Sequence, residues 1–277
     1  MLDYFNNVYE RNLEASRRRA LNLVPRLEPN GIVLDTGCGN GKMSYRTMAA
    51  AGVEEIIGVE MAEAPAKQAQ SRNLSVIRAN LDLSLPLSDE SVDLVFANYV
   101  FAHLTDHDTF LSEVHRVLRP NGYCIVSTEN LSAWHNILAL IAGFQDFSHN
   151  VSSVWYLGNP LSPHYKKHTP PGFSPHFRIF TPRSLLDLFE AHGFHVEQWI
   201  GTGCYPLPRA LARVVEHLAI RHRLSNRLRL PESPFYAFYR VSPPITCLPN
   251  RPPCPIRPLQ GSSRFPLHIC GVKSTVS

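Results

Sequence analysis

The glycines of one short turn are the residues whose spacing could bind a ligand. The stretch VLDTGCGNG, from Val33 to Gly41, follows an apolar run and has a glycine at every second position of its turn. Without a Cβ, the backbone N–H groups of such a turn can approach a ligand closely, and a helix that begins behind it favours an anionic group. A dinucleotide-binding turn would need its third glycine at position 42, which is a lysine. A nicotinamide-dependent oxidoreductase is therefore the less favoured alternative.

Three side chains near apolar runs could take part in ligand binding or chemistry. Asp35 precedes the first glycine of the turn, and Glu60 ends the next apolar run, where a carboxylate can accept hydrogen bonds from a ribose diol. His103 follows a later run, at the edge where open α/β sheets bind their ligands. Its imidazole could act as a general base or only anchor the turn after the strand, and the sequence leaves both open.

The elements that would position these residues alternate between strand and helix patterns. Short apolar runs predict strands at 32–34, 56–59, 75–77, 92–97, 123–127 and 194–200. Helix-forming segments lie between several of them, and one from Asp106 to Leu118 carries its apolar residues on one face. Right-handed crossovers between such units give an open, mostly parallel, doubly wound α/β sheet. A further strand is expected at 235–241 or at 267–272.

Five ordered segments then carry a family resemblance. They are VLDTGCGNG, IIGVE, NLDLSLPLSDESVDLVFANYVFAHL, FLSEVHRVLRPNGYCIVSTEN and HFRIFTPRSLLDLFEAHGF. Their order and content over about 30–200 resemble the class I methyltransferases that use S-adenosylmethionine, in the branch that acts on small molecules. The resemblance implies a seven-stranded Rossmann-like sheet, S-adenosylmethionine as cofactor, and transfer of a methyl group to a small-molecule or lipid-like acceptor, at oxygen.

The resemblance also assigns expected roles to the residues of the turn and of the next strand. It implies that Asp35 lies near the methionine amino group and that Gly37, Gly39 and Gly41 form the turn beside the cofactor. Glu60 would bind the ribose hydroxyls. Met61 would pack against the adenine.

The adenine end of the expected site departs from the family pattern. Where the family usually has an acidic residue after the third strand, this chain has Asn80, whose side-chain oxygen can still accept a hydrogen bond. We expect Asn80 with Leu81 to contact the adenine and hold Asp82 as a substitute. Asn98, at the end of the fourth strand, would place its carbonyl near the methionine moiety.

Candidate substrate residues follow the fifth strand. Glu129 ends that strand, and His176 with Arg178 matches a recurring pair of the family that could contact an anionic or hydroxylated substrate, or anchor a lid. The segment from about 130 to 180 is rich in aromatic residues and proline and is predicted to be an irregular lid or substrate wall. Related sequences often have Glu before the His of the fourth strand, and this chain has Ala102. A catalytically silent binding or assembly protein therefore stays an alternative.

Charge and composition limit the partners. The chain has 277 residues, with 27 Lys+Arg against 23 Asp+Glu. Residues 242–277 contain four basic residues and no acid, so 27 − 4 leaves 23 basic against 23 acidic residues before them. We expect a methyltransferase domain at 1–241 and a Pro-rich, poorly ordered tail at 242–277. No nucleic-acid platform is recognised. A basic amphipathic stretch at 209–230 could contact a membrane or dock on the domain.

Cysteine usage and the first residues predict a compartment. None of the six cysteines has C-x-x-C spacing, so neither a metal site nor a redox site is expected. The start lacks the pattern of a secretory signal, which predicts a cytoplasmic protein. The oligomeric state is not predicted.

Overall fold

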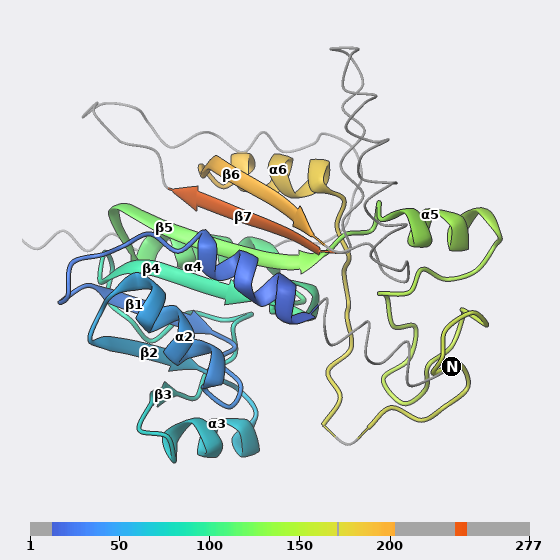
Figure 1. The fold of residues 1–277 in the computed structure, drawn as a ribbon, viewed down its shortest axis with the longest axis horizontal. Helices are drawn as coiled ribbons and strands as arrows, with labels where there is room; N and C mark the ends of the chain where they lie inside the picture. The colour runs from blue at the N-terminus through green and yellow to red at the C-terminus, as the bar shows by residue number, and fades with distance from the viewer. Residues whose placement is uncertain (1–12, 171, 203–235, 243–277) are drawn as a thin grey trace, which may run out of the picture. The chain divides into compact units, whose positions relative to one another are not determined.

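The fold is built on one mixed sheet, seen in a computed structural model that describes residues 13–170, 172–202 and 236–242 (Figure 1). The strand order is β3-β2-β1-β4-β5-β7-β6. The strands are β1 (Ile32–Thr36), β2 (Glu55–Val59), β3 (Ser75–Ile77), β4 (Val92–Asn98), β5 (Leu118–Glu129), β6 (His195–Thr202) and β7 (Tyr236–Ser242). The first five pair in parallel, and β7 lies antiparallel to β5 and β6. The predicted α/β, mostly parallel seven-stranded sheet is confirmed.

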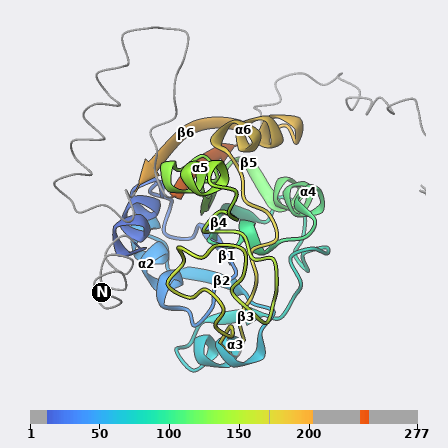
Figure 2. The same ribbon diagram turned by 90° about the vertical axis from the view of Figure 1, so that its right-hand side faces the viewer.

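Helices cover both faces of this sheet. They are α2 (Lys42–Ala51), α3 (Glu63–Gln70), α4 (His107–Val117), α5 (Trp134–Ile141) and α6 (Pro182–Ala191), with a short 3-10 turn η1 (Phe101–His103) after β4. Residues 13–22 form a further helix, which lies on the side of α2, whereas α4 and α6 lie on the opposite side (Figure 2).

Two hydrophobic cores lie on the two sides of the sheet because successive side chains of a strand point to opposite faces. In β4, Val95 belongs to the core under α4 and α6, whereas the neighbouring Phe96 belongs to the core under α2. The same alternation separates Leu34 from Val33 in β1. A strand buried on both faces needs apolar residues at every position, which is why these strands are recognisable as continuous apolar runs.

The ends of α4 and α6 follow the capping residues of the sequence. The Asp106 carboxylate accepts a hydrogen bond from the backbone N–H of Thr109 at 2.9 Å, and Thr181 caps α6 with Pro182 in its first turn. The predicted extension of α4 to Leu118 is wrong by one residue. Leu118 instead pairs with Val92 and begins β5, so the chain passes directly from helix to strand.

The seventh strand, β7, corresponds to the candidate expected at 235–241. β7 inserts between β5 and β6 and pairs with both along its length. The other candidate at 267–272, the basic stretch at 209–230 and residues 243–277 of the expected tail lie outside the described residues, whereas Ser242, the first residue of that tail, ends β7. Residues 1–245 form one compact unit. The domain boundary at 241 stays a prediction.

The segment from 130 to 180 is irregular, as expected, except for one helix. Helix α5 covers Trp134–Ile141, and the rest of the described segment consists of turns, bends and two isolated bridges. The segment lies at the end of the sheet toward which β1, β4 and β5 point (Figures 1 and 2). We refer to residues 130–180 as the lid.

Candidate functional site

The glycine turn follows β1 directly and is held by the end of β2. The backbone N–H groups of Gly37 and Cys38 both donate to the carbonyl of Val59, at 2.8 and 3.0 Å. Gly37 has φ +70, and a Cβ there would meet Val100 at 2.3 Å. A larger residue would therefore clash with the start of the loop after β4. The turn is thus constrained by the end of β2, through hydrogen bonds, and by the loop after β4, through the close approach of Val100.

Gly39 differs from Gly37 because open space surrounds it. It has φ +55, and an added Cβ would meet nothing within 4 Å. Its N–H donates to the carboxylate of Glu60 at 3.0 Å. The surface of the turn at Gly39 is thus a cradle that a side chain would fill, which fits a ligand lying along the backbone.

Asp35 lies buried at the end of β1, below this turn. Its side chain is 2% exposed and accepts a hydrogen bond from the Ser44 hydroxyl at 2.6 Å. Burial raises the pKa of Asp35 from 3.8 to about 7, with a further rise from the charge of Glu60 and an opposing contribution from Ser44. A cationic group of a ligand would favour the ionised form, so the site is suited to an ammonium group.

Glu60 lies after β2 with both carboxylate oxygens next to the turn. One accepts from the Gly39 N–H at 3.0 Å and the other from the Ala62 N–H at 2.8 Å. Since each carboxylate oxygen has two acceptor sites, Glu60 retains capacity for the hydroxyls of a ribose. The residues of the turn and of β2 therefore fit S-adenosylmethionine at its amino and ribose groups.

Of the residues expected to contact the adenine, Met61 and Asn80 are exposed to solvent, whereas Leu81 is partly buried. Met61 is 63% exposed and can pack on a planar ring. Asn80 is exposed, with its side-chain oxygen accepting from the Asp82 N–H at 3.0 Å, and Leu81 packs against the core.

Asp82, held as a substitute for Asn80, has a structural role in the fold. Its carboxylate accepts hydrogen bonds from the N–H and hydroxyl of Thr105 and from the N–H of Asp106, at 2.6–3.0 Å. Although burial alone would raise the pKa of Asp82, these hydrogen bonds hold it below its usual value. Asp82 therefore ties the loop after η1 in place, and Asn80 is the better adenine candidate.

The end of β4 carries a strained residue beside Asn98. The Asn98 side-chain oxygen accepts from the Ser127 hydroxyl at 2.9 Å, which joins β4 to β5. Tyr99 has φ +59, a conformation that non-glycine residues rarely adopt. Such strain is concentrated at binding edges of folds. The expected position of the Asn98 carbonyl near the cofactor stays a prediction.

Three residues predicted separately converge at this edge of the sheet. The rings of His103 and His176 lie 4.6 Å apart, and the His176 Nε2 lies 3.7 Å from an oxygen of Glu129. Glu129 is only 7% exposed. The fold thus joins residues of η1, β5 and the lid in one cluster of two imidazoles and a carboxylate.

His103 is held in one tautomer. Its Nδ1 lies 3.0 Å from the carbonyl of Pro175, and a carbonyl only accepts, so Nδ1 carries the proton and Nε2 has the acceptor lone pair. Burial and the neighbouring His176 lower the pKa of His103, against smaller contributions from the Pro175 carbonyl and Glu129. His103 is therefore neutral near pH 7, as a base must be.

Arg178 has a different environment from His176. The N–H groups of Phe177 and Arg178 point to the Ala102 carbonyl, at 2.8 and 3.4 Å, and attach this part of the lid to η1. The Arg178 side chain is exposed. Burial lowers the pKa of His107, and the charge of Arg178 adds to that effect. The two residues expected to act as a pair thus differ in exposure.

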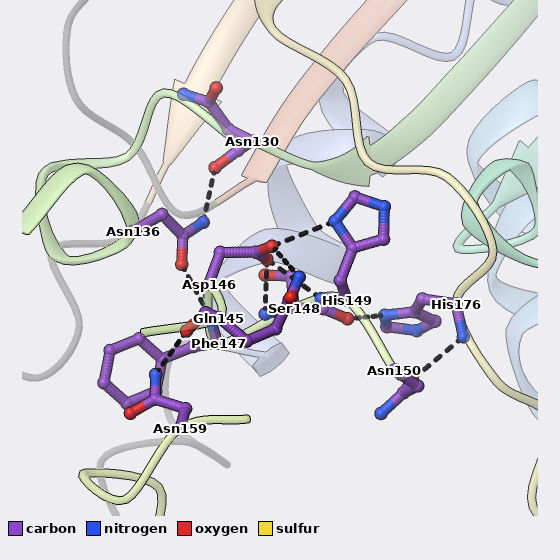
Figure 3. A network of polar contacts seen from close by, with 10 residues as sticks. All are labelled: Asn130, Asn136, Gln145, Asp146, Phe147, Ser148, His149, Asn150, Asn159 and His176. Carbon is purple, nitrogen blue, oxygen red and sulfur yellow. Dashed lines mark hydrogen bonds and ion pairs between the residues drawn. The ribbon is translucent and has the colours of Figure 1, made fainter. Parts of the chain in front are cut away.

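A polar network in the lid, which sequence reasoning missed, holds His176 (Figure 3). The His176 Nδ1 donates to the Ser148 carbonyl at 2.8 Å. The buried carboxylate of Asp146 accepts from the N–H groups of Ser148 and His149 and from the His149 ring, all at 2.9 Å. The bond to Asp146 raises the pKa of His149 despite its burial. No spacing marked these residues, because they meet through an irregular loop.

Asn136 connects this network to the end of β5. Its side-chain amide donates to the Asn130 carbonyl at 3.0 Å and accepts from the Phe147 N–H at 3.0 Å (Figure 3). Within the part of the chain that the structure describes, no group of three or more His, Cys, Asp or Glu residues could hold a metal ion.

The family of this fold is decided by comparison with known proteins. A family model described as a methyltransferase domain matches residues 34–126, from β1 into β5. A protein of Mycolicibacterium smegmatis named "Probable S-adenosylmethionine-dependent methyltransferase" is 32% identical over 172 residues, which are 61% of this chain and 54% of that protein. Residues 34–126 belong to this methyltransferase domain family, and the chain is similar to methyltransferases that use S-adenosylmethionine. S-adenosylmethionine is the cofactor of this domain.

Two further comparisons bear on the methyltransferase domain. A malonyl-[acyl-carrier protein] O-methyltransferase of Methylococcus capsulatus is 36% identical over 104 residues, covering 36% of this chain and 38% of that protein. A chain of the solved complex between the Haloferax volcanii Trm112 methyltransferase activator and its methyltransferase matches with a TM-score of 0.56 and 16% identity, over 86% of this chain and 93% of that one. The latter likeness concerns the fold alone. The chain spans about half the length of the Mycolicibacterium relative.

Proposed function

We propose that the protein transfers the methyl group of S-adenosylmethionine to an oxygen atom of a small-molecule or lipid-like acceptor. The observation that carries the proposal is the cluster of His103, His176 and Glu129 at the sheet edge that also holds the glycine turn. The O-methyltransferase relative supports oxygen as the acceptor atom. Its resemblance covers 104 residues, 36% of this chain, so the acceptor itself has to be found by experiment.

Different residues of the chain bind the cofactor and accept the proton. The sulfonium of S-adenosylmethionine supplies an activated methyl group, and in-line transfer mainly requires an oriented nucleophile and exclusion of water. Asp35 and Glu60 bind the amino and ribose groups, with Gly39 leaving room for them. His103 Nε2 takes the proton of the acceptor hydroxyl, and the nearby carboxylate of Glu129 stabilises the imidazolium that results.

The experiment compares methyl transfer by the His103→Gln variant with that by the parent protein, both as the full chain. We expect the rate of labelled methyl transfer into a metabolite extract to fall about 10²–10⁴-fold, the range that a general base contributes. S-adenosylmethionine affinity, measured by calorimetry, should stay within about twofold, since His103 acts on the acceptor. His115→Gln, on the exposed side of α4, is the matched control and should behave like the parent protein.

The pH profile gives an independent check. Because burial holds the pKa of His103 below 6.5, the parent enzyme should lose kcat on acidification through a pKa below that value. His103→Gln should lack that acid limb. Equal rates in the two proteins would remove His103 as the base.

A catalytically silent binding protein is the second candidate, favoured by Asn80 and Ala102 at positions where the family has acids. It predicts cofactor binding with no labelled product from any extract. Absence of cofactor binding by a folded sample would refute both candidates. The methyltransferase family match speaks against the nicotinamide alternative.

A further inference from the structure

Exposed apolar side chains are concentrated in the lid. Twelve large hydrophobic residues are exposed in the described part of the chain, and ten of them lie between Ile137 and Phe177. The other two, Met61 and Leu83, lie elsewhere on the domain. Scattered apolar residues are normal on a protein surface, whereas a concentration in one segment indicates a binding surface.

Helix α5 has an inverted pattern of burial. It buries His135 and Asn136, which are 4% and 0% exposed, and it exposes Leu138 and Ile141, which are 55% and 78% exposed. A helix on the surface of a water-soluble domain has the opposite arrangement. Asn136 explains the orientation, because its amide bridges Asn130 and Phe147 and must stay inside (Figure 3). The aliphatic side chains are thereby held outward by the polar network.

The charges of the lid favour one kind of partner. Asp146 is the only acid between residues 130 and 180, and it is 3% exposed and paired with His149. The charged side chains that the lid exposes are Lys166, Lys167 and Arg178, all basic. Apolar side chains combined with exposed basic groups are the composition of surfaces that bind anionic lipid bilayers.

The position of the lid connects this surface to the active site. α5 and the loops around 150–170 lie at the end of the sheet toward which β1, β4 and β5 point, the end that carries His103 and Glu129 (Figures 1 and 2). None of the helices in the described residues is long and apolar enough to cross a membrane.

We infer that the lid docks peripherally on an anionic bilayer through the exposed side chains of α5, Leu161, Lys166 and Lys167, a group that we name the lid surface. The aliphatic groups enter the interface while the lysines meet lipid phosphates. This rests on the proposed function and narrows it: the acceptor is an amphiphile of the bilayer whose hydroxyl reaches His103 from the membrane side.

The test measures binding of the full chain to vesicles by flotation, without cofactor. We expect the protein to float with phosphatidylcholine vesicles that contain phosphatidylserine and to float less with phosphatidylcholine alone. Leu161→Asp combined with Ile141→Asp should lower the bound fraction about tenfold, because two charges would have to enter the interface. Lys166→Glu combined with Lys167→Glu should remove the preference for the anionic lipid.

Leu83→Asp is the matched control, since Leu83 and Leu161 are 61% and 64% exposed. It should float like the parent protein. Equal flotation of the parent and of the variant with both Leu161→Asp and Ile141→Asp would overturn the inference, whatever other segment binds the vesicles. Absence of vesicle binding, with a dimer in light scattering that the lid variants abolish, would also overturn it and assign the surface to a second copy.

The outcome is independent of the proposed reaction. Calorimetry with S-adenosylmethionine on the same variants should give the parent affinity, because none of the substituted residues belongs to the glycine turn. Vesicle binding without methyl transfer would contradict the proposed function alone. Transfer without vesicle binding would contradict the docking alone.

Discussion

Gly37 and Gly39 have similar backbone conformations but opposite surroundings. Both have positive φ, yet a Cβ would strike Val100 at Gly37 and nothing within 4 Å at Gly39. The first glycine is thus required by the packing of the protein against itself, and the second leaves space for a ligand. Substitution at Gly39 can therefore separate cofactor binding from folding.

We expect Gly39→Ala to weaken S-adenosylmethionine binding at least about tenfold, since the new methyl group would occupy the cradle beside the turn. Gly143→Ala is the control, because Gly143 also has a positive φ and nothing within 4 Å of an added Cβ. Both substitutions should cost a similar 1–2 kcal/mol or so of backbone strain. Calorimetry measures the affinity and thermal unfolding measures the strain. Equal cofactor affinity in the two variants would show that the cofactor does not lie along Gly39.

At the scale of elements, the lid depends on one buried carboxylate. Asp146 accepts hydrogen bonds from three backbone or ring N–H groups and from the Gln145 side chain. These bonds order the loop whose Ser148 carbonyl orients His176. An amide at this position would present two N–H groups to neighbours that are themselves donors.

Asp146→Asn should therefore lower kcat/KM for the acceptor about tenfold or more while leaving the affinity for S-adenosylmethionine within about twofold. Steady-state kinetics and calorimetry measure the two quantities. Asp187→Asn is the control, since Asp187 pairs with Arg183 on the exposed side of α6. A parallel loss of cofactor affinity in Asp146→Asn would mean that the network supports the whole edge of the sheet.

At the scale of the whole molecule, Asp35 couples protonation to stability. Its pKa is about 7 in the folded protein against 3.8 when exposed, so between these values the folded state holds a proton that the unfolded state has lost. Stability from this group is complete below pH 4 and falls as pH rises through about 7. At about 1.4 kcal/mol per pKa unit, the loss is on the order of 4 kcal/mol.

We expect Asp35→Asn to be more stable than the parent at pH 8, similar to it at pH 4, and unable to bind S-adenosylmethionine. The amide needs no proton and can still accept from Ser44, but it cannot pair with the methionine ammonium. Urea unfolding at the two pH values measures the first effect and calorimetry the second. Asp93→Asn, which removes a partly exposed partner of Arg119, should lack the stability gain at pH 8. A parallel pH dependence in Asp35→Asn and the parent would contradict the linkage.

The features that could be predicted from the sequence are local ones. The apolar runs of the doubly buried strands and the glycine spacing each depend on neighbours in the chain. They were sufficient for the sheet and for the glycine turn after β1. The ordered motifs indicated the family, because they follow consecutive strands of the sheet.

The features that required the three-dimensional structure join distant residues. His103, Glu129 and His176 come from η1, β5 and the lid, and only the crossing of these segments brings their side chains together. The Asp82 carboxylate accepts a hydrogen bond from the Thr105 hydroxyl. The position of Asp82 in the sequence, near the residues expected to contact the adenine, did not indicate this contact. Helix α5 escaped periodicity analysis because it buries its polar residues and exposes its aliphatic ones. Local patterns report which face of an element is apolar, but which face is buried depends on partners that the rest of the chain supplies.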